Sequence, residues 1–366
     1  MNTKKQKTNI KALNAISLFS CIGIGEYYLK EIGINTIVAN EIDPKRCKTY
    51  QFFHPDTDVI CGDIIDSEIK EKILSYSIKE KIDLIIATPP CQGMSSVGKN
   101  RNDGTLHDDK RNLLILETLK IIDSVLPNYV IIENVPRFLK VKYIYKNTSL
   151  SIVDLLKKKY EKIYDIKVDI FNAADFGIPQ VRTRAFIRLH KKGLIWNDPL
   201  LEKKHITVSD AIGDLPSLES GMKSELKNHW ARVHPKNQIT WMKNTPTGET
   251  AFNNIIEFPV KADGNRIKGY KNCYRRIDWD KPAPTVTMRN EIISSQNNVH
   301  PGRKLNDSTW SDARVLTLRE LLILTSMPPD IDLPTDISDT ALRQLIGEGI
   351  PSLMMKKILQ GITNEK

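Results

Sequence analysis

The chain has 366 residues, of which 40% are hydrophobic and 27% are charged, as in an ordinary globular protein with a polar surface. This length predicts one large domain and one smaller domain. The 54 Lys and Arg residues outnumber the 44 Asp and Glu residues, and the net charge of +10 suits a nucleic acid better than a membrane surface. The five cysteines form no Cys-x-x-Cys pair, which excludes the common zinc sites and predicts no bound metal. No apolar run reaches transmembrane length, and the lysine-rich residues 1–12 predict a solvated tail rather than a signal peptide.

From Ala15 to Leu189, short apolar runs typical of β-strands alternate with amphipathic stretches typical of helices. This alternation predicts an α/β fold with a mostly parallel, doubly wound sheet covered on both faces. The predicted strands are Ala15–Phe19, Thr36–Asn40, Asp58–Cys61, Leu84–Ala87, Val130–Ile132, Ile166–Phe171 and Ala185–Leu189. The predicted helices are Glu26–Glu31, Pro44–Phe53, Asp66–Ser75, Arg111–Val125 and Ser151–Tyr160.

The pattern changes after His190. Residues 190–274 show few convincing helices, and basic residues outnumber acidic ones there. Helical patterning returns at Thr317–Ser326 and Leu342–Leu359. We therefore expect residues 13–189 and 315–366 to form one domain, interrupted by a smaller, irregular and basic domain at residues 190–314.

Glycines or carboxylates follow each of the first three predicted strands. Gly23 and Gly25 follow the first strand, Glu41 the second and Asp63 the third. Glycines at such a turn let a ligand approach the backbone, and a carboxylate can accept the hydroxyls of a ribose. Each feature alone is explained as well by a tight turn or, at Asp43, by a helix N-cap. Together they predict a nucleoside cofactor at the carboxyl edge of the sheet.

The fourth strand runs into Thr88-Pro89-Pro90-Cys91-Gln92, where two prolines present a cysteine stiffly as a candidate thiolate nucleophile. A free cysteine is more often a buried small hydrophobic residue, but such a residue lies within a strand or helix. The following residues 93–110, with three glycines, indicate a lid or a surface loop. Glu133 follows the fifth strand and is expected near Cys91, where an acid beside a nucleophile suits addition to a heteroaromatic ring.

Gln180-Val181-Arg182-Thr183-Arg184 brings two arginines onto one face of an extended segment. Paired guanidinium groups suit phosphate or base oxygens, although a solvated charged face is the simpler explanation.

The ordered set of motifs resembles the cytosine-5 DNA methyltransferase family of bacterial restriction-modification systems. The resemblance spans residues 15–360 and includes a segment after the irregular region, Arg276–Thr287, and a C-terminal one, Gly347–Pro351. The motif residues before these are Phe19 to Gly23, Asn40-Glu41, Gly62-Asp63, Pro90-Cys91-Gln92, Glu133-Asn134-Val135 and Gln180-x-Arg182-x-Arg184.

This resemblance implies that Cys91 attacks carbon 6 of a cytosine flipped out of double-stranded DNA, while Glu133 engages the ring N3 and the amino group. It also implies that Arg184 binds the base O2, that Arg182 positions the lid or the backbone, and that S-adenosyl-L-methionine donates the methyl group to carbon 5. The implied cofactor contacts are Phe19, Gly23, Gly25, Glu41, Ile42, Asp63, Ile64, Pro90 and Leu114. The implied substrate contacts are Gln92, Ser95, Asn134 and Gln180.

The sequence departs from the family pattern at four positions. Cys21 replaces a glycine, Ser17 an acidic residue, Ile42 an aromatic residue and Glu348 an asparagine. We expect a monomer in the bacterial cytoplasm that modifies the site of a restriction endonuclease. A tRNA methyltransferase of the same family and a catalytically idle DNA-binding relative are the alternatives. A nicotinamide oxidoreductase is the least favoured, because the pyrophosphate loop has the wrong spacing.

Overall fold

The computed structural model describes residues 12–90, 113–267 and 269–363, and the chain divides into two compact units. Unit 1 comprises Met1–Phe171, Thr183–Leu200 and Met355–Lys366, and unit 2 comprises Asn172–Arg182 and Leu201–Met354. Residues 315–354 thus group with the irregular region, whereas the sequence assigned them to the first domain. Among the described residues, no helix is both long and apolar enough to cross a membrane.

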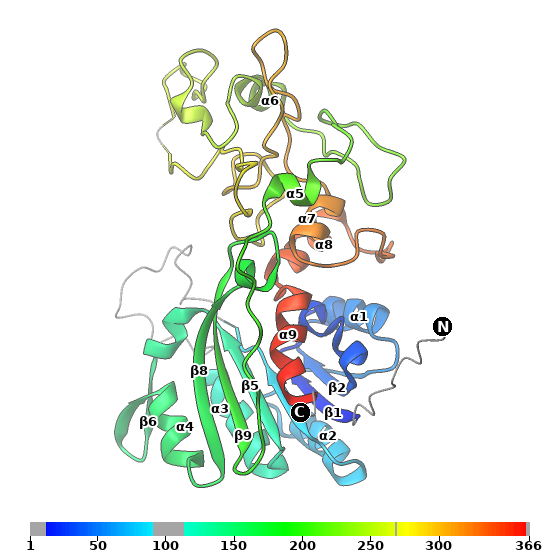
Figure 1. Cartoon of the computed structure of the whole chain (residues 1–366), viewed down its shortest axis with the longest axis vertical. Coiled ribbons are helices and arrows are strands. Elements are labelled where there is room, and N and C mark those ends of the chain that lie inside the picture. Colours follow the sequence, from blue (N-terminus) through cyan, green and yellow to red (C-terminus); the bar gives the residue numbers. More distant parts are fainter. Residues whose placement is uncertain (1–11, 91–112, 268, 364–366) are drawn as a thin grey trace, which may run out of the picture. The chain divides into compact units, whose positions relative to one another are not determined.

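Unit 1 is built on a seven-stranded sheet with the strand order β3-β2-β1-β4-β5-β9-β8 (Figure 1). The five strands β1 to β5 pair in parallel, and β9 runs antiparallel to β5, so the predicted mainly parallel α/β fold is confirmed. The strands are β1 (Leu13–Leu18), β2 (Ile34–Glu41), β3 (Asp58–Cys61), β4 (Leu84–Ala87), β5 (Tyr129–Asn134), β8 (Tyr164–Asn172) and β9 (Thr183–Lys191).

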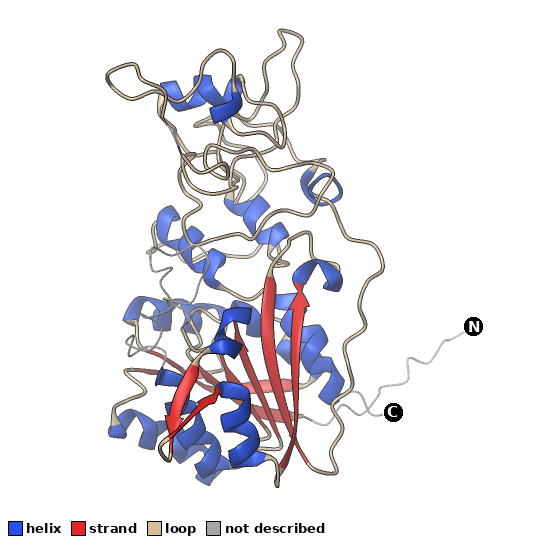
Figure 2. Cartoon of the chain, turned by 90° about the vertical axis from the view of Figure 1, so that its left-hand side faces the viewer, coloured by secondary structure: helices blue, strands red, loops and turns tan. Residues whose placement is uncertain are grey.

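Helices lie beside the strands and cover the sheet (Figure 2). All residues of β4 and β5 are buried, as expected for central strands with both faces covered. The N-cap Asp43 and Pro44 at the first helical position begin α1. The helices of this unit are α1 (Pro44–Phe53), α2 (Ser67–Lys79), α3 (Leu114–Val125) and α4 (Ile152–Tyr160), and α9 (Ser352–Thr363) lies largely in it.

Two predicted helices were wrong in detail, and one hairpin was not predicted. In place of a helix at residues 26–31 there are two 3-10 turns, η1 (Ile24–Glu26) and η2 (Leu29–Ile32). Ile24, Glu26, Leu29 and Ile32 are buried, and the last three follow the three-residue repeat of that helix. The single helix predicted at residues 342–359 is two helices, because Gly349 and Pro351 separate α8 (Asp339–Glu348) from α9. Strands β6 (Lys142–Tyr145) and β7 (Thr148–Ser151) form the additional hairpin.

In the described part of unit 2, β pairing beyond the end of β8 consists of isolated bridges. Its helices are short: α5 (Val208–Ile212), α6 (Lys236–Lys243), α7 (Leu318–Leu324) and α8. Without a sheet, many backbone carbonyls need side-chain donors. The buried Arg276 guanidinium donates to the carbonyl oxygens of Met242, His300 and Ser311.

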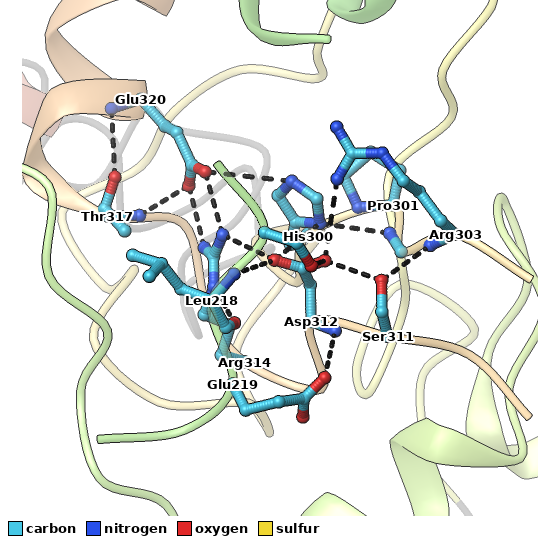
Figure 3. A network of polar contacts seen from close by, with 12 residues as sticks. Leu218, Glu219, His300, Pro301, Arg303, Ser311, Asp312, Arg314, Thr317 and Glu320 are labelled. Carbon is cyan, nitrogen blue, oxygen red and sulfur yellow. Dashed lines mark hydrogen bonds and ion pairs between the residues drawn. The ribbon is translucent and has the colours of Figure 1, made fainter. Parts of the chain in front are cut away.

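A buried ion network joins the segment near Leu218 to residues 312–320, which lie far from it in the sequence of unit 2 (Figure 3). Arg314 donates to Asp312 and to Glu320, each at 2.9 Å, and to the carbonyl oxygen of Leu218 at 2.7 Å. Glu320 also accepts from the backbone of Thr317 in the capping box that begins α7. The network therefore holds residues near 218, 312 and 320 together.

Burial opposes ionisation of Glu320, but the charges of Arg314 and His300 outweigh it and lower the Glu320 pKa to about 2. Burial, followed by the charge of Arg314, lowers the pKa of His300 to about 3. Both groups bind protons more weakly in the folded chain than in the unfolded chain. The network's contribution to stability is therefore lost as the pH falls, first below the ordinary histidine pKa of 6.5 and then from 4.5 toward 2.

Replacing Glu320→Gln should lower the free energy of unfolding of unit 2 by about 3–5 kcal/mol, because it leaves the buried Arg314 charge without one partner. Chemical denaturation at neutral pH measures this loss. The control is Asp332→Asn, which removes a surface ion pair with Lys227. The Asp332 side chain is 85% exposed, so this change should alter stability by less than about 1 kcal/mol. Equal effects of the two substitutions would contradict a structural role for the network.

Candidate active site

The register of the sheet brings the ends of five strands to one level. Leu18 of β1 pairs with Asn40 of β2 and Ala87 of β4. Asn40 pairs with Ile60 of β3, and Ala87 pairs with Ile132 of β5. The next residues along the chain therefore emerge at one carboxyl edge. They include Phe19, Glu41 and Glu133, which the sequence predicted as site residues.

The glycine loop after β1 is held in a defined backbone shape. Phe19, Cys21 and Gly23 have φ values of 59°, 49° and 75°, in the left-handed region. At Gly23 a Cβ atom would lie 2.3 Å from His54 Nε2, so only glycine fits there. Cys21, which replaces a glycine of the family pattern, adopts the required conformation and donates its N–H to Glu41 Oε2 at 3.0 Å. Gly25 follows within η1.

Glu41 is buried at the end of β2 and its carboxylate is fixed by backbone donors. Oε1 accepts from the N–H groups of Ile42 and Asp43, and Oε2 accepts from that of Cys21. A carboxylate offers about four acceptor positions, so one position on Oε2 is left for another donor. The Asp43 carboxylate caps α1. The two alternatives weighed for this strand end, a hydroxyl acceptor and an N-cap, therefore fall on different residues.

The residues after β3 differ in their exposure to solvent. Asp63 is exposed, and its Oδ1 accepts from the N–H of Ile65 in a turn. Ile64, predicted as a cofactor contact, is a buried member of the core cluster of unit 1. Its neighbour Ile65 is 56% exposed, and Ile42 after β2 is 60% exposed. The apolar surface available beside these strand ends therefore comes from Ile42 and Ile65.

The turn after β4 is tied to both neighbouring strands. The Asn134 amide donates to the carbonyl oxygen of Pro89 at 2.9 Å. Thr88 donates its hydroxyl to the carbonyl oxygen of Phe19 at 2.9 Å. Pro90 ends this described segment, and Leu114 begins α3 and packs against the core. The predicted site residues Cys91, Gln92 and Ser95 lie outside the described residues.

Glu133 and Arg184 form an ion pair at the end of β5. Glu133 and Asn134 pair with Phe186 and Ala185 of the antiparallel β9, so Arg184 is the next residue along β9. Arg184 Nε lies 3.0 Å from Glu133 Oε1, and both side chains are largely buried. The guanidinium also donates to the carbonyl oxygen of Thr183. Two residues that the sequence assigned to the same chemistry are thus in direct contact.

Gln180 and Arg182, the other two members of this motif, belong to unit 2 and are buried. The Arg182 guanidinium donates to the carbonyl oxygens of Val286, Gly347 and Glu348. Gln180 donates to the carbonyl oxygen of Leu324 and accepts from the N–H of Val286. The described side-chain contacts of both residues are therefore with the backbone of unit 2. Val286, Gly347 and Glu348 lie in the two segments that resemble family motifs, and Leu324 ends α7.

The sequence did not predict that Thr88 links the turn after β1 to the turn after β4. It also did not predict that Glu26 is a buried carboxyl group that binds the hydroxyls of Ser17 and Tyr50. A threonine after a strand and a glutamate in a predicted helix carry no local signal of such contacts. Among the described residues, no cluster of His, Cys, Asp or Glu could hold a metal ion.

Fold and strand-end geometry together define an α/β protein with a mainly parallel sheet, whose strand order reverses between β1 and β4. Open α/β sheets commonly bind ligands at the carboxyl edge beside such a point. Residues 13–364 match the family model described as C-5 cytosine-specific DNA methylase. The Type II methyltransferase M1.HgaI of Avibacterium volantium is 48% identical over 355 residues, which are 97% of this chain and 99% of that protein.

A second relative, the Type II methyltransferase M1.HphI of Haemophilus parahaemolyticus, is 31% identical over 97% of this chain and 88% of its own length. The crystal structure of a DNA modification methyltransferase encoded within an E. coli prophage matches with a TM-score of 0.69. Its sequence identity is 22%, and the match covers 96% of this chain and 98% of that one, so this likeness concerns the fold. The chain belongs to the C-5 cytosine-specific DNA methylase family. It is a DNA cytosine-5 methyltransferase of the restriction-modification type, and it requires a methyl donor.

Replacing Arg182→Met should destabilise unit 2 by about 3 kcal/mol, because three carbonyl oxygens lose their charged donor. Thermal or chemical denaturation measures the change. The control Arg289→Met removes an arginine of the same unit whose side chain is 75% exposed, and it should change stability by less than about 0.5 kcal/mol. Unchanged stability of the Arg182 variant would show that its carbonyl contacts contribute little.

Proposed function

We propose that this methyltransferase acts on one cytosine within a specific duplex DNA sequence, with Cys91 as nucleophile and S-adenosyl-L-methionine as methyl donor. The cofactor binds at the carboxyl edge of the Rossmann-like sheet in unit 1. The basic, irregular residues 190–314 form the target-recognition domain. The protein works as a monomer in the bacterial cytoplasm and protects the recognition site of a cognate restriction endonuclease.

The observation that supports this reading most is the Glu133–Arg184 ion pair at the end of β5. The neighbouring strand β4 leads through Pro89 and Pro90 to Cys91 in the sequence. The ion pair thus provides an acid and a fixed guanidinium beside the strand that precedes the cysteine. Addition of a thiolate to a pyrimidine ring requires such groups. The thiolate attacks carbon 6, the acid hydrogen-bonds or protonates the ring N3, and the guanidinium binds O2, so that the negative charge developing on the ring is neutralised.

The residues at the strand ends fit a nucleoside cofactor. Glu41 keeps one acceptor position on Oε2 for a ribose hydroxyl. Ile42 and Ile65 expose apolar side chains that suit the faces of an adenine ring, and the exposed Asp63 can accept from its amino group. When bound, S-adenosyl-L-methionine supplies an electrophilic methyl group on its sulfonium sulfur. Ile65 thereby takes the role that the sequence gave to the buried Ile64.

The protein side chains divide the chemistry among them. Cys91 adds to carbon 6 of a flipped cytosine, which makes carbon 5 nucleophilic. Glu133 engages N3 and the amino group, and Arg184 orients Glu133 and binds O2. Asn134 fixes the Pro89 carbonyl and thereby the direction in which the chain enters Cys91. Methyl transfer is followed by loss of the carbon 5 proton and release of Cys91. Arg182 and Gln180 act as positioning residues, since their described contacts are with the backbone.

Duplex DNA that contains 5-fluorocytosine should trap a covalent adduct with Cys91, because release of Cys91 requires removal of a proton from carbon 5 and fluorine stands in place of that proton. Incubation of the full chain with this DNA and S-adenosyl-L-methionine, followed by denaturing electrophoresis, measures the adduct. Cys91→Ser should give no adduct and should lower methyl transfer to duplex DNA by more than about 1000-fold, while cofactor binding in calorimetry stays within about twofold.

The matched control is Cys61→Ser, which changes the exposed cysteine at the end of β3 and should form the adduct normally. An adduct that persists in Cys91→Ser would contradict the assignment of the nucleophile. Methyl transfer to tRNA and not to duplex DNA would contradict the DNA substrate. Absence of any adduct in the unchanged chain would indicate a catalytically idle protein.

A further inference from the structure

A buried carboxyl group lies beneath the glycine loop, outside every residue assigned to the site so far. Glu26, in η1, is 7% exposed. Its Oε1 accepts a hydrogen bond from the Ser17 hydroxyl at 2.5 Å, and its Oε2 accepts one from the Tyr50 hydroxyl. Ser17 belongs to β1 and Tyr50 to α1, so this carboxyl joins the strand before the loop to the helix after β2.

Hydroxyl groups extend this contact into the loop itself. Ser20 donates its hydroxyl to Ser17 Oγ at 2.8 Å. The same hydroxyl lies 3.2 Å from the carbonyl oxygen of Asn40, which also accepts the Ser20 N–H at 3.0 Å. The path therefore runs from Glu26 through Ser17 and Ser20 to the end of β2, next to Glu41.

The opposite side of the loop is held by the same helix. His54 Nε2 donates to the carbonyl oxygen of Gly23 at 2.9 Å, and its ring lies 4.5 Å from the Tyr50 ring between centroids. Glu26 donates its own N–H to the Gly23 carbonyl oxygen at 3.1 Å. A displacement of Glu26 or Tyr50 would therefore shift the backbone at Gly23.

The hydroxyl groups of this path can form a complete set of hydrogen bonds in two ways. When Glu26 is ionised, it accepts from Ser17 and Tyr50, and Ser20 donates to Ser17. When Glu26 is protonated, its own O–H must donate. The path can then reverse, with Glu26 donating to Ser17, Ser17 to Ser20, and Ser20 to the Asn40 carbonyl oxygen. Hydrogen bonds to an ionised carboxylate are shorter and about twice as strong as neutral ones, so the loop is held more firmly in the ionised arrangement.

We propose that Glu26 is a positioning residue for the cofactor loop, and that its ionised form holds residues 19–25 in the shape that binds the cofactor. This inference rests on the proposed binding of S-adenosyl-L-methionine at that loop. Because ionised Glu26 is favoured in the complex, binding releases a proton when Glu26 is protonated in the free protein, and the affinity rises with pH.

Glu26 titrates in a pH range in which binding can be measured. Burial raises the pKa of Glu26 to about 7, although the Ser17 and Tyr50 hydroxyls oppose the rise. Tyr50 and His54, the titratable side chains packed near it, each keep one protonation state from about pH 6 to about pH 8.5. Burial and the Glu26 charge raise the pKa of Tyr50, and burial lowers that of His54 to about 4. Lys30, which acts on His54, forms an ion pair with Asp56 at the surface.

Titration calorimetry of the full chain tests the proposal, with S-adenosyl-L-homocysteine as the ligand so that no sulfonium charge is present. From about pH 6 to about pH 8, the affinity should rise about three- to tenfold, since one unit of pKa coupling corresponds to a tenfold change. Measurements in buffers of different ionisation enthalpy should show proton release near pH 7. Glu26→Gln should give a flat profile without proton release.

Tyr50→Phe provides a second readout if the glutamine variant fails to fold. Loss of one hydroxyl donor should raise the Glu26 pKa further and move the midpoint of the profile to higher pH, whereas a merely structural defect would lower affinity equally at every pH. The control Glu31→Gln changes a nearby exposed carboxylate paired with Lys356 and should keep the profile of the unchanged chain.

A pH slope that persists in Glu26→Gln, or a flat profile in the unchanged chain, would overturn the proposal. A slope seen with S-adenosyl-L-methionine but not with S-adenosyl-L-homocysteine would assign it to attraction of the sulfonium and would also overturn it. Absence of binding by either ligand at every pH would instead overturn the proposed cofactor site.

Discussion

The parallel register of β1, β2, β3, β4 and β5 is the constraint on which the candidate site depends. Because Leu18, Asn40, Ile60, Ala87 and Ile132 align, the glycine loop, Glu41, the Pro89-Pro90 turn and Glu133 all emerge at one edge. A shift of one residue in any strand would turn its side chains to the other face and withdraw its contribution. The links from Thr88 to Phe19 and from Asn134 to Pro89 then fix the turns relative to one another.

The second unit solves a different problem, since its described chain has little regular structure to satisfy the backbone. Buried guanidinium groups take that role: Arg182 and Arg276 each donate to three or more carbonyl oxygens, and Arg314 joins two carboxylates to a carbonyl. Such groups fix a particular path of the chain, because each donor direction is set by a planar fork. The basic composition of the chain therefore has a structural component as well as a component that suits DNA.

The strands of the large sheet, most helices and the order of the strand-end residues could be predicted from the sequence, because apolar periodicity and local caps encode them. The predicted segments 58–61, 84–87 and 44–53 agree with β3, β4 and α1. What could not be predicted depends on contacts between distant segments. Three features follow only from the tertiary structure. The Arg182 side chain is buried against backbone carbonyls, Ile65 rather than Ile64 is exposed, and hydroxyl groups connect Glu26 to the carbonyl oxygen of Asn40. The grouping of residues 315–354 with unit 2 also depends on such contacts, since Glu320 is bound to Arg314 and Asp312 lies in the same network.

We propose that this chain methylates cytosine in one DNA sequence through Cys91. Bisulfite sequencing of plasmid DNA from cells that express the protein tests it most directly. We expect cytosines in a single sequence context to resist conversion when the unchanged chain is expressed, and to convert fully when Cys91→Ser is expressed at the same level. Full conversion with both proteins would contradict cytosine methylation by this chain, and protection that survives the loss of Cys91 would contradict its role as nucleophile.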